Sequence, residues 1–75
     1  MHDIRVLSSE PVSDGNSLEF VQCLGSWNHV FWFEYQVTLF GILYTVEVSE
    51  SGAALLKEAW KQGSLTRVYQ MLAQS

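Results

Sequence analysis

One stretch of the sequence decides the fold, and it reads His29-Val-Phe-Trp-Phe-Glu-Tyr-Gln-Val-Thr-Leu-Phe-Gly-Ile-Leu-Tyr-Thr-Val-Glu-Val48. It contains two runs rich in aromatic and β-branched residues that meet at Gly41, a composition typical of two strands joined by a turn. Gly41 supplies the positive φ that a tight turn requires. Phe40 beside it is an unusual turn residue, so the turn type stays open. The sequence predicts an antiparallel hairpin over residues 29–48.

The side chains of this hairpin alternate between an apolar face and a polar one, because a strand points successive side chains to opposite sides. The apolar positions of the first run are His29, Phe31, Phe33, Tyr35, Val37 and Leu39. Those of the second run are Ile42, Tyr44, Val46 and Val48. The opposite face has a polar middle, formed by Glu34, Gln36 and Thr38. This pattern predicts an antiparallel sheet that is covered on one side only.

Two segments before the hairpin extend the predicted sheet. Residues 3–8 alternate weakly and predict a short edge strand, whereas residues 10–17 contain Pro11 and a run of turn-forming residues and predict a loop. Residues 18–24 resume the strand pattern, and residues 25–28 are predicted to turn into the hairpin. Four side chains of this strand are predicted to lie on the same face: Leu18, Phe20, Gln22 and Leu24. Together with the hairpin, this strand gives a three-stranded meander.

After residue 48 the hydrophobic period changes from 2 to 3.6. Ser49 or Ser51 is a suitable N-cap for a helix, and Glu50 suits the positive end of the helix dipole. Gly63 is a predicted helix stop, and Ser64 is a predicted cap for a second helix. The apolar face of the first helix is Leu56, Ala59 and Trp60, and that of the second is Leu65, Val68, Tyr69 and Leu72.

The predicted fold is a single small α+β domain over residues 1–75: an antiparallel three- to four-stranded β-meander followed by two short C-terminal helices packed on one sheet face. A chain of this length buries only roughly 60% of its unfolded surface. The core therefore depends on large aromatic side chains, for which the candidates are Phe20, Phe31, Phe33, Tyr35, Tyr44 and Trp60. So small a core favours self-association.

The charge balance is acidic: eight acidic residues oppose four basic ones, for a formal net charge of −4. This argues against binding to nucleic acid or to an anionic membrane and is compatible with docking on a basic protein surface. Cys23 is the single cysteine, so an internal disulfide is excluded and a reducing compartment fits. No apolar stretch approaches the ~20 residues of a membrane span, and no signal peptide is recognised. We expect a cytoplasmic protein.

The sequence shows no catalytic, cofactor or metal motif. One cysteine and the separated His2 and His29 fall short of a four-ligand zinc site. Cys23 lacks a marked base and orienting group, so it is interpreted as a small buried thiol. Glu34 and Glu47 are expected to lie close together on the open polar face, which lacks the enclosure needed for acid–base catalysis. We expect a protein that is not an enzyme and has no cofactor or metal.

The two helices around Gly63 have the layout of a helix-turn-helix. The side chains of the second helix that would contact DNA are Ser64, Thr66, Arg67 and Gln70. Only four basic residues are available in the chain to neutralise phosphates. DNA binding is therefore a less favoured alternative.

The strongest functional signal is apolar surface beyond the needs of one core. Trp32, Phe40 and Leu43 fall on the predicted polar side of the hairpin, where exposed apolar side chains rimmed by polar ones indicate a protein contact. The alternative is that the helices cover part of both faces and bury these residues. The candidate protein-binding residues are Trp27, Trp32, Glu34, Phe40, Leu43, Glu47 and Tyr69.

We therefore expect a protein-interaction module: a small acidic inhibitor or adaptor that occupies a surface on a larger partner, in the manner of phage-encoded proteins that block host machinery. The alternative is a structural homodimer joined through a sheet edge or an aromatic patch. A small-molecule pocket between helices and sheet, which would leave no motif, also stays open. The main hypothesis requires Phe31, Phe33 and Tyr35 to point inward beneath the helices while Trp32 stays available.

Overall fold

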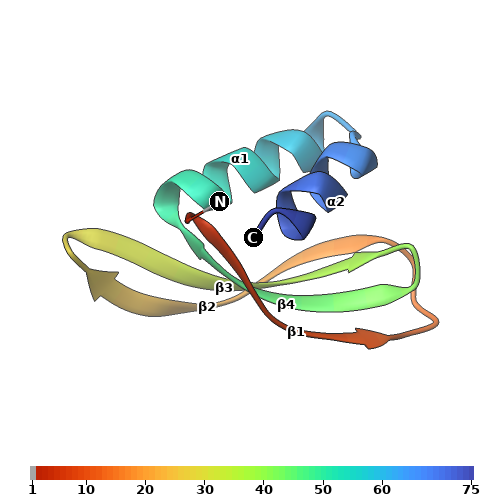
Figure 1. Cartoon of the computed structure of the whole chain (residues 1–75), viewed down its shortest axis with the longest axis horizontal. Helices are drawn as coiled ribbons and strands as arrows, with labels where there is room; N and C mark the ends of the chain where they lie inside the picture. The colour runs from red at the N-terminus through yellow and green to blue at the C-terminus, as the bar shows by residue number, and fades with distance from the viewer. Residues whose placement is uncertain (1) are drawn as a thin grey trace.

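The computed structural model describes residues 2–75 and contains a four-stranded antiparallel sheet with two helices on one face (Figure 1). The elements are β1 (Ile4–Pro11), β2 (Ser17–Trp27), β3 (Val30–Leu39), β4 (Ile42–Ser49), α1 (Glu50–Lys61) and α2 (Leu65–Ala73). The order in the sheet is β1-β4-β3-β2, so β2, β3 and β4 form the predicted meander and β1 pairs with β4. The predicted α+β fold is confirmed. Within the described chain, neither helix has the length and apolar composition needed to cross a membrane.

Tight two-residue turns join β2 to β3 and β3 to β4. Asn28 and His29 have φ values of 53° and 63°, and Phe40 and Gly41 have values of 51° and 80°. Two consecutive positive φ values are typical of a type I′ turn, which settles the turn type at Gly41. A bulky residue in this region is strained. The N–H of Phe40 donates to Asn16 Oδ1 at 3.1 Å, which ties the turn to the loop after β1.

Strand β2 is longer than predicted and contains two irregularities. Its pairing with β3 shifts register between Phe20 and Gln22 and again between Cys23 and Gly25. The first shift reverses the alternation of side chains, so the predicted grouping of Gln22 with Phe20 is wrong. The predicted turn over residues 25–28 is also wrong: the strand continues to Trp27, and the positive φ of 110° at Gly25 lies within it.

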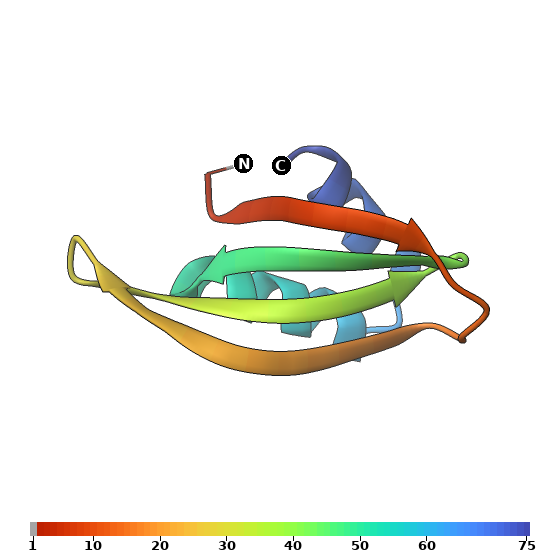
Figure 2. The same cartoon turned by 90° about the horizontal axis from the view of Figure 1, so that it is seen from below.

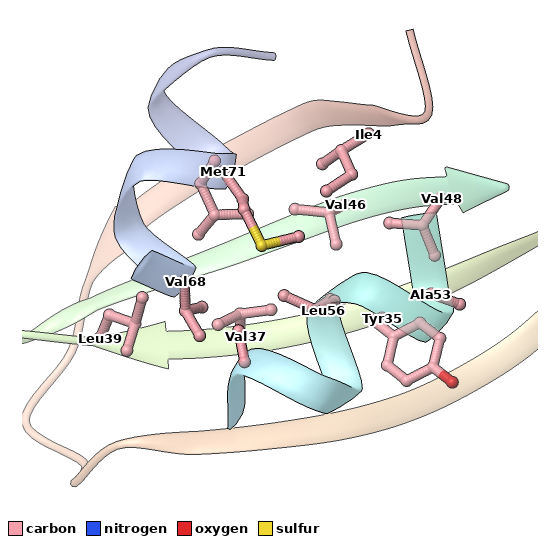
Figure 3. Packing of buried hydrophobic residues seen from close by; sticks show 12 residues of the cluster. Ile4, Tyr35, Val37, Leu39, Val46, Val48, Ala53, Leu56, Val68 and Met71 are labelled. Atoms are coloured by element: carbon pink, nitrogen blue, oxygen red, sulfur yellow. The ribbon is translucent and has the colours of Figure 1, made fainter. Parts of the chain in front are cut away.

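The core lies between the sheet and the helices, as Figure 3 shows for its buried side chains. Its members are Ile4, Tyr35, Val37, Leu39, Val46, Val48, Ala53, Leu56, Ala59, Val68, Met71 and Leu72. The apolar positions predicted for the two hairpin strands and both helices supply most of this set. Phe33, Tyr44 and Trp60 pack at its margin.

Two of the predicted core residues lie outside the core. Phe20 is 58% exposed and Phe31 is 50% exposed. The reason is the position of the helices: α1 packs on β3 and β4, and α2 packs on β1. Strand β2 lies at the uncovered margin of the sheet, and the turn that joins it to β3 projects beyond the helices (Figures 1 and 2).

The start of α1 is tied to the start of the chain. The Ser49 hydroxyl accepts a hydrogen bond from the Gly52 N–H at 3.1 Å and donates one to Asp3 Oδ1 at 2.8 Å. The Ser49 N–H also donates to the Asp3 carbonyl oxygen at 2.9 Å. A Cβ atom on Gly52 would overlap that carbonyl oxygen. Ser49 is therefore the N-cap, and Gly52 permits the close approach of the two segments.

The predicted helix stop at Gly63 is confirmed. Gly63 has a φ of 73°, and its N–H donates to the Trp60 carbonyl at 2.9 Å. The Ser64 N–H donates to the Ala59 carbonyl at 3.1 Å, which completes a Schellman motif. Ser64 lies at the predicted N-cap of α2, but its side chain makes no capping hydrogen bond.

Replacing Ser49 with alanine should lower the free energy of unfolding by about 1–3 kcal/mol, because it removes a cap and leaves a buried N–H without its acceptor. Ser64→Ala is the matched control at the other helix start, and its effect should stay below about 0.5 kcal/mol, since no capping hydrogen bond is lost. Urea titrations of both variants provide the comparison. Equal midpoints for the two variants would contradict the role assigned to Ser49.

Replacing Gly52 with alanine should also destabilise the fold, by about 1–3 kcal/mol, because the added methyl group pushes β1 away from α1. This cost outweighs the gain of about 1 kcal/mol that alanine normally brings to a helix. Gly15→Ala is the control, since a Cβ there would meet no atom within 4 Å. A thermal melt in which Gly52→Ala unfolds at the wild-type temperature or above would show that the approach to Asp3 is not tight.

Candidate functional site

Exposed apolar side chains are concentrated on β2 and on the start of β3. The large exposed apolar residues in this region are Phe20, Val21, Leu24, Trp27 and Phe31, and Trp27 is 72% exposed. We call residues 24–32 the hairpin arm: the end of β2, the Asn28–His29 turn and the start of β3. The arm extends past the N-terminal end of α1 (Figure 1). Neither face of the arm is covered by a helix there.

The arm is held in place by one contact from the helix layer. The backbone N–H of Phe31 donates to Glu50 Oε1 at 2.9 Å. Glu50 is the first residue of α1, so the same carboxylate lies at the favourable end of the helix dipole. This contact joins the arm to the N-terminal end of α1.

On the helix side of the sheet, an open groove of about 800 Å³ lies between β2 and α1. Its apolar floor is formed by Leu18, Phe20, Phe33 and Tyr35, and its rim by Glu50, Lys57, Glu58 and Lys61 beside Ala53 and Ala54. The Phe20 ring packs edge-on against Tyr35 and Phe33, at centroid distances of 5.5 and 6.3 Å. Lys57 Nζ lies 5.8 Å from the centre of the Tyr35 ring. The groove is thus aromatic at its floor and charged at its rim.

The opposite face of the sheet carries a polar row that crosses all four strands. Arg5 pairs in register with Glu47, Glu47 with Glu34, and Glu34 with Gln22. Gln22 Nε2 donates to Glu34 Oε1 at 2.9 Å. The predicted proximity of Glu34 and Glu47 is confirmed. Like charges directly opposite on neighbouring strands destabilise a sheet. A cation near Glu34 and Glu47 would reduce the repulsion between them.

Beside this row lies a hollow of about 360 Å³, which we call the tryptophan hollow. It is lined by His2, Arg5, Leu24, Gly25, Ser26, Trp27, Trp32 and Glu47. Trp32 is partly buried, and its Nε1 atom is buried without a hydrogen-bond partner among the described residues. An unpaired buried donor costs about 1–3 kcal/mol. Trp32 therefore lines the hollow, whereas its Nε1 atom is enclosed within the protein.

The structure separates the predicted protein-binding residues into two groups. Trp27, Trp32 and Glu47 line the hollow, and Glu34 lies next to Glu47 in the polar row. The Phe40 and Tyr69 rings pack edge-on with centroids 6.3 Å apart, at the other end of β3. Phe40 therefore lies against α2 and not on the predicted polar side of the sheet.

Leu43 is the remaining predicted residue. It is partly buried on β4, where its register partners are Glu10 and Thr38. It is thus remote in register from Trp32, which pairs with Ser49 at the other end of β4. Leu43 does not line the tryptophan hollow.

The sequence pattern does not identify several exposed residues of β2 and of the arm. The pattern predicts Phe20 and Phe31 in the core, and it groups Leu24 with Phe20 because it does not reveal the bulges of β2. Cys23, interpreted as a buried thiol, is exposed. The sequence does contain a signal for this exposure. Apolar side chains occur at both alternating sets of positions in residues 18–33, and a core on one face of the sheet cannot bury both sets.

The described residues contain no group of three or more His, Cys, Asp or Glu side chains arranged to hold a metal ion. Comparisons with known protein families, curated proteins and solved structures find no match to this chain.

The exposed position of the arm predicts a contrast between two aromatic residues of β3. Phe31→Ala should lower the free energy of unfolding by less than about 1 kcal/mol, because the ring is half exposed. Tyr35→Ala should lower it by about 3 kcal/mol or more, since that ring is 5% exposed and belongs to the core. Guanidinium titration of the two variants measures the contrast, and equal losses would mean that the arm is part of the core.

Proposed function

We propose that this protein is a non-enzymatic interaction module that acts as an inhibitor or adaptor by occupying a surface on a larger partner protein. The contact surface is the hairpin arm together with the tryptophan hollow. The observation that carries the proposal is the exposure of Trp27 and Phe31, 72% and 50%, on an arm that no helix covers. Tryptophan is enriched at binding hot spots, and clustered apolar exposure marks interaction surfaces.

The composition of β2 supports an intermolecular role for this margin of the sheet. Proteins protect edge strands with lysine, proline or bulges. Strand β2 contains no lysine, arginine or proline, and its protection consists of two register shifts and Glu19. The shifts interrupt the row of backbone groups that another strand would need, which favours contact through side chains over a long intermolecular ladder.

The charges on the face opposite the helices support a basic partner. Glu34 and Glu47 are adjacent there, and Arg5 is the cation in their row. The chain as a whole carries a formal net charge of −4. A partner with a basic surface would be attracted over longer distances and would gain specificity from these charges.

The single cysteine is exposed and free, and an exposed free thiol persists in a reducing compartment. We therefore include a cytoplasmic location in the proposal. A DNA-binding role has less support, because the exposed face of α2 offers Arg67 as its single cation.

A structural homodimer is the second candidate. The observation that favours it is the apolar floor of the groove between β2 and α1, which a second copy would cover. A core as small as this one gains stability from such coverage.

Site-specific photo-crosslinking in cells of the native host distinguishes these possibilities. A photoreactive phenylalanine analogue at position 31 should give one dominant adduct with a larger protein. The same analogue at Leu55, an exposed position on α1, is the control and should not give that adduct. An adduct of twice the chain mass of 8.5 kDa would instead identify the homodimer. Identical adduct patterns from both positions, or none from position 31, would refute the proposed contact surface.

A further inference from the structure

We infer that the tryptophan hollow and the adjoining Glu34–Glu47 pair bind an arginine side chain of the partner. This inference rests on the proposed function and specifies the chemistry of its contact. Two features lead to it: a pair of opposed carboxylates, and an adjoining hollow that two tryptophan side chains help to line.

The carboxylate pair has acceptor capacity that its neighbours leave open. Gln22 gives Glu34 one hydrogen bond, and Arg5 lies opposite Glu47 on the other side of the row. An ionised carboxylate offers about four acceptor sites. A guanidinium carries five N–H donors in a rigid plane and can therefore bind to both carboxylates at once. Its charge would also relieve the repulsion between them.

The indole groups favour a guanidinium over an ammonium. Trp32 lies two positions before Glu34 on the same strand, so both side chains point to the same face of the sheet. An indole face attracts cations more strongly than the other aromatic rings do. A planar guanidinium stacks on such a face and is more weakly hydrated than the compact ammonium of lysine. Leu24 and Trp27 offer apolar surface to the aliphatic part of the arginine side chain.

The Trp32 indole contributes its ring and not its N–H to this contact, because the Nε1 atom is buried. A guanidinium has no acceptor and could not bind to an indole N–H in any case. Stacking on the ring is therefore the part of the contact that Trp32 supplies.

The charge of Arg5 affects where the guanidinium of the partner's arginine can bind. Arg5 also lines the hollow and would repel a second guanidinium. Because Arg5 lies opposite Glu47 on β1, the more favourable place for the ligand is toward β3, between Glu34 and Trp32. Contact with Glu34 should therefore matter at least as much as contact with Glu47.

NMR titration of the isotope-labelled protein with Nα-acetyl-arginine methylamide tests the inference. This probe carries the guanidinium on a backbone without terminal charges. The indole N–H signals of Trp27 and Trp32 should move, whereas that of Trp60 on α1 should stay in place and serve as an internal control. Raising the salt concentration should weaken binding, because the contact is between partly exposed charges. The norleucine analogue of the probe, which lacks the guanidinium, should leave all three signals unchanged.

Two variants assign the contact to the carboxylates. Glu34→Gln and Glu47→Gln should each raise the dissociation constant of the probe by about threefold to fivefold, the range of one exposed ion pair. Glu58→Gln is the control, since Glu58 lies on α1 and accepts a hydrogen bond from Gln62. Amide spectra of the variants verify that each is folded.

Unchanged Trp32 signals at saturating probe, an equal response to the norleucine analogue, or undiminished binding by Glu34→Gln would each overturn the inference. These outcomes are distinguishable from a failure of the proposed function. If the arm still crosslinks to one larger protein, the interaction module stands and only the arginine contact is refuted.

Discussion

The contact on which the rest of the structure depends is the packing of α1 against β3 and β4. Its position follows from the tie between Asp3, Ser49 and Gly52, which fixes the start of α1 beside the start of β1. Helices pack about 10 Å apart, roughly twice the strand spacing of about 4.8 Å. With α2 on the β1 side, the helix layer ends before it reaches β2. The uncovered margin is therefore a consequence of where α1 begins.

This arrangement separates the buried core from an exposed apolar margin. Val37, Val46 and Val48 are completely buried under the helices and supply the apolar burial that a small domain needs. Trp27 and Phe31 lie beyond the helix layer and contribute little to that burial. Their exposure is the basis of the interaction surface that we propose.

The two faces of the uncovered region differ in chemistry. The helix side offers an apolar floor with a rim of both charge signs, whereas the other side offers two carboxylates beside two indole groups. The first would suit a broad apolar contact, such as that with a second copy of the chain. The second would suit a cation, which is the basis of the arginine contact that we propose. The acidic net charge of the chain adds to the second effect.

The sequence predicted the order and type of the elements, but not the end of β1 or the part of the sheet that the helices cover. Glu10 and Pro11, predicted to lie in a loop, belong to β1 and pair with β4. Period-2 alternation located β3 and β4, the change to a 3.6-residue period located both helices, and Gly63 marked the end of α1. Alternation shows which face a side chain joins, but it does not show whether a helix lies over that position. Phe31 and Tyr35 share a face in the pattern, yet only Tyr35 is buried.

The alternation of apolar and polar residues also does not reveal the bulges of β2. A bulge inserts one residue without a distinctive composition, so the faces of Gln22 and Cys23 were exchanged. The role of Gly52 depends on the approach of Asp3, 49 residues earlier in the chain, which no local pattern encodes. The carboxylate pair was predictable because both Glu34 and Glu47 lie on strands joined by a short turn.

Native-state hydrogen exchange, read amide by amide, tests most directly the claim that the helices stabilise one part of the sheet and leave the arm outside it. The buried amides of β4 should exchange only through global unfolding, whereas ladder amides of residues 25–32 should exchange through local opening at a clearly lower free energy. Exchange of the arm at the free energy of global unfolding would contradict this account, because the arm would then belong to the cooperative core.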